Sequence, residues 1–114
     1  MFSFLFLDPP TVPRNLIRLR STKSSITVKW ERPKDTGSVP FISFALEVGI
    51  DKDLYSVNYS ITGSRKELKE YEHTFRHLTA NIIYTVRVSA YNTFGKGAAV
   101  TKKFKTVIYS RPCE

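Results

Sequence analysis

The chain has 114 residues, of which 41% are hydrophobic and 25% charged, a composition that indicates one globular domain and excludes a disordered or fibrous chain. No apolar run approaches the roughly 20 residues that cross a bilayer, so we expect no membrane-spanning segment in this chain. The net charge of +8 favours acidic partners, and the single cysteine, Cys113, excludes an internal disulfide.

The start of the chain is rich in proline. Three prolines between positions 9 and 13 favour a stiff, extended segment with few hydrogen-bond donors. We therefore expect residues 1–11 to form a tail and linker, residues 12–108 to form the domain, and residues 109–114 to form a second tail.

The first two strands are predicted at positions 15–20 and 26–31. In the first strand, Ile17 and Leu19 alternate with arginines, so a one-residue slip or bulge would point both aliphatic side chains inward. In the second strand, Trp30 ends a run of alternating aliphatic residues. It is the only tryptophan, and we expect it at the centre of the core.

The next three strands are predicted at positions 41–50, 54–61 and 71–75, and the middle one is expected to lie at a sheet edge. Within the longest of the three, Phe44 and Leu46 fall on one face by the two-residue period of a strand, so both are expected to point into the core.

A further strand is predicted from position 82 to 91, because Tyr84, Val86 and Val88 alternate with polar residues. Tyr84 follows Leu78 by six residues, where a tyrosine can bury its ring and turn its hydroxyl back to an upstream backbone group. Residues Asn92 to Gly97 contain two glycines and are predicted to form a loop before a last strand at 100–107.

Strands with one apolar face each need a second sheet to cover that face. The chain also contains the pattern Pro13-x-Asn-Leu16, Ile26-x-Val-x-Trp30-x-x-Pro33, Asp35-x-Gly37-x-x-Pro40 and Leu78-(x5)-Tyr84-x-Val-x-Val-x-Ala-x-Asn92-x-x-Gly95-x-Gly97. With this pattern, the chain resembles a fibronectin type III domain across roughly Val12 to Ile108. With the strands lettered A, B, C, C′, E, F and G in chain order, the resemblance implies an all-β, two-sheet antiparallel immunoglobulin-like sandwich of seven strands, A-B-E and C′-C-F-G.

This resemblance implies a non-catalytic protein-interaction or spacer module, one repeat of a larger cell-surface receptor or adhesion protein in an extracellular setting. Two alternatives stay open: a module that binds a heparan-sulfate-type polyanion, and a cytoplasmic structural repeat of the muscle-filament kind. Asn58-Tyr-Ser60 is an N-glycosylation sequon, which favours the extracellular setting.

No set of residues indicates catalysis, a cofactor, a metal ion or a nucleic-acid partner. His73 and His77 are four residues apart, which in a strand separates them by about 13 Å, too far to share a metal ion. We expect His73 to be partly buried and His77 to be exposed.

Two candidate binding surfaces follow from the predicted strands. The first is the tip of the predicted loop, Thr93, Phe94 and Lys96. The second consists of basic residues on the outer sheet faces, which could bind a polyanion. Acidic residues are interspersed among them, so ordinary solvated charge with no bound partner is the simpler interpretation. These basic residues are Arg18, Arg20, Lys29 and Arg76 on the A-B-E sheet, and Arg87, Lys103 and Lys105 on the C-F-G sheet.

Overall fold

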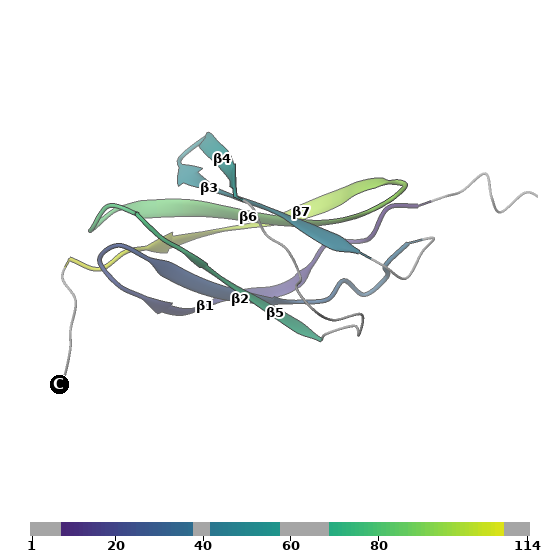
Figure 1. Ribbon diagram of the computed structural model, residues 1–114, viewed down its shortest axis with the longest axis horizontal. Coiled ribbons are helices and arrows are strands. Elements are labelled where there is room, and N and C mark those ends of the chain that lie inside the picture. Colours follow the sequence, from purple (N-terminus) through teal and green to yellow (C-terminus); the bar gives the residue numbers. More distant parts are fainter. Residues whose placement is uncertain (1–7, 38–41, 58–68, 109–114) are drawn as a thin grey trace, which may run out of the picture.

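A computed structural model describes residues 8–37, 42–57 and 69–108. Within these residues the strands are β1 (Arg14–Ser21), β2 (Ile26–Glu31), β3 (Ser43–Ile50), β4 (Asp53–Val57), β5 (Glu70–Phe75), β6 (Ile83–Asn92) and β7 (Gly95–Lys105). They form two antiparallel sheets, β1-β2-β5 and β4-β3-β6-β7, which stack as two layers (Figure 1). The predicted two-sheet sandwich is therefore confirmed. No helix in the described ranges is long and apolar enough to cross a membrane.

The core lies between the two layers and is filled by the side chains that point inward from alternate positions of the strands. All seven core residues named from the sequence lie in it: Trp30, Tyr84, Leu78, Phe44, Leu46, Val86 and Val88. The remaining buried hydrophobic residues are Leu16, Ile26, Val28, Val48, Tyr71, Phe75 and Ala90.

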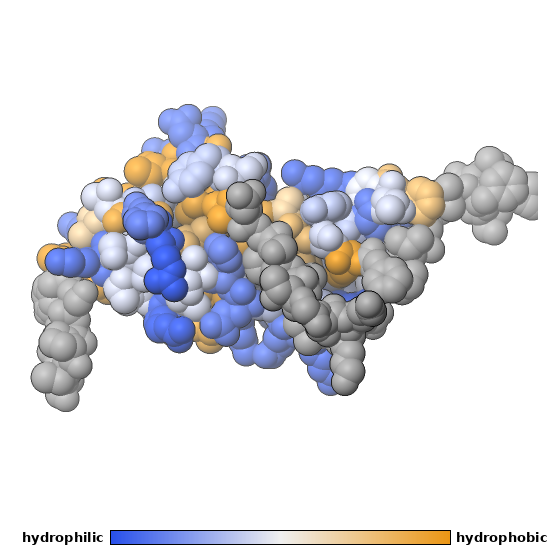
Figure 2. All heavy atoms as spheres, viewed as in Figure 1, coloured by the Kyte–Doolittle hydropathy of each residue, from blue (hydrophilic) through white to orange (hydrophobic). Residues whose placement is uncertain are grey.

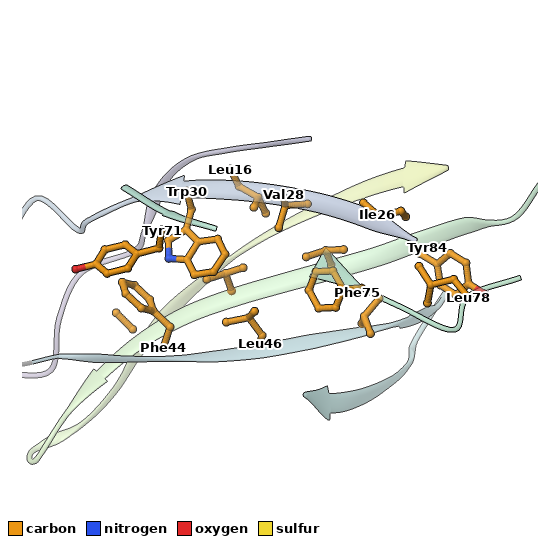
Figure 3. Packing of buried hydrophobic residues seen from close by; sticks show 14 residues of the cluster. Leu16, Ile26, Val28, Trp30, Phe44, Leu46, Tyr71, Phe75, Leu78 and Tyr84 are labelled. Carbon is orange, nitrogen blue, oxygen red and sulfur yellow. The ribbon is translucent and has the colours of Figure 1, made fainter. Parts of the chain in front are cut away.

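Three aromatic rings join the sheets at one end of the core (Figure 3). The ring of Trp30, from β2, meets that of Phe44, from β3 of the opposite sheet, edge to face at a centroid distance of 5.4 Å. The Tyr71 ring, from β5, lies 4.5 Å from Phe44 and 6.1 Å from Trp30. Aromatic pairs at such distances stabilise a core beyond the area that they bury.

The other end of the core is closed by Tyr84 and Leu78 (Figure 3). The hydroxyl oxygen of Tyr84 accepts a hydrogen bond of 2.7 Å from the backbone N–H of Thr79, the upstream backbone group that its position predicted. The N–H of Leu78 donates to the carbonyl of Ser24 at 2.9 Å, which ties the turn before β6 to the turn between β1 and β2.

The register of β1 differs from the prediction. Leu16 is fully buried, whereas Ile17 and Leu19 are 42% and 40% exposed. The pairing of β1 with β2 shifts twice, between Arg14 and Ile17 and between Arg18 and Arg20, as expected where bulges interrupt a ladder. Asn15, in the first shift, has a φ of 54°, a left-handed conformation that asparagine tolerates better than most residues. That turn points Leu16 inward.

The predicted loop from Asn92 to Gly97 is also wrong, because most of it is strand. Asn92 pairs with Gly95, so only Thr93 and Phe94 form the turn between β6 and β7. The side-chain oxygen of Asn92 accepts a hydrogen bond of 2.7 Å from the N–H of Phe94, which stabilises the tight turn locally. Gly95 provides the positive φ, 144°, at which β7 begins, well before the predicted position 100.

Replacing Trp30 by alanine should lower the free energy of unfolding by about 3–5 kcal/mol, because it removes the ring that contacts both sheets. Small domains have only about 5–15 kcal/mol of stability, so the variant should be partly or fully unfolded. Chemical denaturation measures this change. Ile17→Ala, at an exposed position, is the control and should change stability by less than about 0.5 kcal/mol; equal effects of the two substitutions would contradict the role given to Trp30.

Candidate functional site

The turn between β6 and β7 presents two aromatic side chains to solvent. Tyr91 is 41% exposed and Phe94 is 42% exposed. With Lys96 they border a shallow hollow of about 470 Å³, whose other side is formed by Ala45 of β3. Exposed aromatic residues beside a hollow are typical of protein-binding surfaces.

Small side chains adjoin this hollow on the outer face of the larger sheet. Ala45, Ser89 and Ala99 are direct neighbours on β3, β6 and β7, so three small side chains form a row across the strands. Larger residues border this row on both sides: Tyr91 pairs with Lys96 on one side, and Arg87 pairs with Glu47 and Thr101 on the other. The bordering rows are four residues apart, about 13 Å. We call this depression the β3-β6-β7 trough.

The hairpin at the end of the trough is held by Asn92, which is buried. Its side-chain nitrogen donates to the carbonyl of Asp8 at 2.9 Å and to that of Thr36 at 3.1 Å. One side chain therefore joins the hairpin to the segment before β1 and to the loop after β2. Because Asn92 also accepts a hydrogen bond from the N–H of Phe94, this network holds the backbone of the turn at Phe94.

The segment before β1 packs on the same hairpin. A Cβ atom added to Gly97 would overlap the carbonyl oxygen of Pro10, so the close approach of this segment requires glycine there. Thr11 and Asp35 exchange hydrogen bonds: the Thr11 N–H donates to the Asp35 carbonyl at 2.9 Å, and the Asp35 N–H donates to the Thr11 hydroxyl at 3.0 Å. These contacts complete the support of the trough's aromatic end.

The basic residues expected on the outer face of the smaller sheet do not form one group. Lys29 lies 3.2 Å from Glu70, and Arg20 lies 3.9 Å from Glu72, so both cations have acidic neighbours. Arg18 pairs across the ladder with Val28, whose side chain is in the core, so the arginine lies at the edge between the sheets and not on the outer face. The prediction for Arg18 fails because of the bulges in β1.

Arg76 follows the end of β5 and lines a pocket between β4 and β5 that neither Arg20 nor Lys29 lines. His73 and His77 line the same pocket; His73 is half-buried and His77 exposed. Among residues 8–37, 42–57 and 69–108, no three His, Cys, Asp or Glu side chains are grouped so that they could hold a metal ion.

The basic residues of the larger sheet do share one outer face. Arg87 pairs with Thr101, and Lys103 and Lys105 lie opposite Thr85 and Ile83 on the outward side of the ladder. Arg87 also forms an ion pair of 3.1 Å with Glu47.

Sequence reasoning missed one lysine and the floor of the trough. Lys102 lies opposite Val86, whose side chain is in the core, so this exposed lysine borders the gap between the sheets at the β7 edge. The row of small residues became visible only when the strands were paired, since no period within one strand indicates it. Asn58, the candidate glycosylation site, lies outside the described residues.

Replacing Asn92 by alanine should lower the free energy of unfolding by about 1–3 kcal/mol, because its side chain no longer donates to the carbonyls of Asp8 and Thr36 and each such hydrogen bond contributes about 0.5–1.5 kcal/mol. The amide of Phe94, which loses its acceptor, should exchange with solvent faster. Hydrogen exchange measured by NMR checks both effects. Thr93→Ala, an exposed change in the same turn, should leave exchange unaltered, and a similar response of the two variants would argue against the bracing role of Asn92.

Comparison with known proteins identifies the fold. The family model of the fibronectin type III domain matches residues 8–107. A fourth FNIII domain of a human protein superposes with a TM-score of 0.72 at 20% identity, covering 93% of this chain and 86% of that one. A titin fragment gives a TM-score of 0.70 at 21% identity (88% and 33% coverage), and the rat CD45 extracellular region gives 0.66 at 20% (88% and 51%). This chain thus spans about a third of the titin fragment and half of the CD45 fragment. Because the family model covers nearly the whole described sequence, the chain belongs to the fibronectin type III family.

Proposed function

We propose that this domain is a non-catalytic protein-binding and spacer module of a larger cell-surface receptor or adhesion protein, and that its binding surface is the β3-β6-β7 trough. The family and the likeness to modules of CD45 and titin support the general role. The observation that carries the proposal is the pair of exposed aromatic residues, Tyr91 and Phe94, on a hairpin braced by Asn92.

The bracing matters for affinity because binding has to overcome the entropy of ordering the surface. Each rotamer-rich side chain or loop that becomes fixed on binding costs about 0.5–1.5 kcal/mol. The turn at Phe94 is only two residues long and is bonded to Asn92, so little of this cost remains. Rigid aromatic side chains on such a turn are suited to serve as anchors.

The charge around the trough indicates the chemistry of the partner. Lys96 borders the aromatic end, and Lys103 and Lys105 continue along the outer side of β7. A complementary protein surface would be acidic, with an apolar side chain that fits beside Tyr91. Such charge complementarity increases association rate and specificity more than it increases affinity.

A heparan-sulfate-type polyanion is the weaker alternative. Of the seven basic residues considered, Arg20, Lys29 and Arg87 each have an acidic neighbour within 4.0 Å, Arg18 lies at the edge between the sheets, and Arg76 lines the pocket between β4 and β5. Lys103 and Lys105 alone are a small target for an extended polyanion, which gains affinity from many charges in a row.

Tyr91→Ala and Phe94→Ala should each reduce binding of the domain, displayed as a dimeric fusion, to a panel of cultured cells. Loss of a central aromatic anchor typically costs at least about 2 kcal/mol, or roughly 30-fold in affinity. Flow cytometry measures the binding. Ile17→Ala, of similar exposure on the other sheet, is the control. If all three variants bind these cells as well as the unaltered domain does, the trough is not the partner surface.

The cell-surface location is tested at Asn58. We expect the domain, secreted from eukaryotic cells behind a supplied signal peptide, to carry a glycan on this residue. Intact-mass analysis before and after glycosidase should then show a mass loss that Asn58→Gln abolishes. An unmodified mass would instead favour an intracellular setting, in which titin-like repeats occur.

A further inference from the structure

A second hollow, of about 430 Å³, opens between the two sheets along their β4 and β5 edges. Its apolar part is made by Val48 and Val57 from the larger sheet and by Phe75 from the smaller one. On the face seen in Figure 2, hydrophobic surface is visible below β4, between the layers, with hydrophilic residues around it. The volume is within the usual range of small-molecule sites.

The hollow exists because β4 is short and stands at an edge. Tyr55 lies opposite Val48 in the ladder and so is on the inner side of its sheet, yet 55% of it is exposed. Its ring forms one wall of the hollow instead of filling the core. The opposite wall is His73, whose ring packs edge-on against that of Phe75 at 4.8 Å.

Among the described residues, the charged and titratable groups that line this hollow are all basic or neutral. They are Tyr55 from β4, His73 from β5, and Arg76 and His77 from the turn after β5. No aspartate or glutamate of the described ranges is among the lining residues. A guanidinium and two imidazoles around an apolar floor match a negative group on an apolar body.

We propose that this hollow binds a small aromatic carboxylate, with the ring on Val48, Val57 and Phe75 and the carboxylate toward Arg76 and His73. A planar guanidinium can bind a carboxylate through two parallel hydrogen bonds, and an apolar floor of this size accepts one aromatic ring. The site is separate from the β3-β6-β7 trough, which lies on the outer face of the larger sheet, so the two proposals are independent.

The environment of His73 links this binding to protons. Burial, and then the neighbouring Arg76, lower the pKa of His73 below its usual 6.5, so the imidazole is neutral at pH 7. A bound carboxylate would favour the charged imidazolium and raise that pKa. Binding would then take up a proton, and affinity should increase as the pH falls from 7.5 towards 6.

The test is an NMR titration of the domain with phenylacetate at pH 6.0 and pH 7.5. We expect saturable shifts at His73, Phe75 and Val57, with a Kd on the order of 1 mM for a ligand of this size and tighter binding at the lower pH. Phenylacetamide, which keeps the ring and lacks the charge, should bind at least about 10-fold more weakly, as expected for loss of a charge-assisted hydrogen bond.

Two variants separate this site from general attraction of anions to a basic protein. Arg76→Gln should weaken phenylacetate binding by about 10-fold, whereas Arg20→Gln, the same change on the outer face of the smaller sheet, should leave it unchanged. Thermal melting of both variants checks that the fold is intact. Shifts that do not saturate, or that respond equally to the two substitutions, would overturn the proposal.

Discussion

The contact between Trp30 and Phe44 across the two sheets is the interaction on which the rest of the domain depends. With Cys113 as its only cysteine, the chain has no internal disulfide to hold one sheet to the other, so the sandwich depends on packing. The ring of Tyr71 extends this contact to β5, and Tyr84 closes the opposite end of the core through its bond to Thr79. The trough is the outward side of strands whose inward side belongs to this core, and the hollow beside Tyr55 has the core residues Val48 and Phe75 in its floor.

The proposed binding surface uses the same contacts that make the domain fold. Asn92 is buried and donates to backbone carbonyls of two other segments, and its side-chain oxygen accepts a hydrogen bond from the backbone N–H of Phe94. A partner that contacts the hairpin is therefore close to the segment before β1, which packs on Gly97. In a chain of several domains, this arrangement brings the recognition surface next to the connection with whatever precedes it.

Alternation within single strands was enough to predict the sandwich. Trp30, Val86 and Val88 fall on inward positions by a two-residue period, and the position of Tyr84 after Leu78 predicted its hydroxyl contact. The errors arose where the backbone conformation departs from that period. The left-handed conformation of Asn15 shifts the register of β1. The hydrogen bond between Asn92 and Phe94 closes a two-residue turn where a longer loop was predicted. The trough and the hollow beside Tyr55 each combine residues from three strands. Their existence depends on register and sheet edges, which no single stretch of sequence specifies.

The bulges of β1 affect how this edge of the sandwich would behave beside neighbouring domains in a multidomain chain. They place Arg18 at the border of the gap between the sheets, where Lys102 stands on the β7 edge, and β1 and β7 approach each other across that gap. An edge strand that carries inward-pointing charge is a poor template for a foreign strand, because pairing would bury the cation. Tethered copies of similar domains meet at high local concentration, where exchange or stacking of strands is a constant hazard. In such a chain, Arg18 and Lys102 would disfavour the addition of a foreign strand at this side of the sandwich.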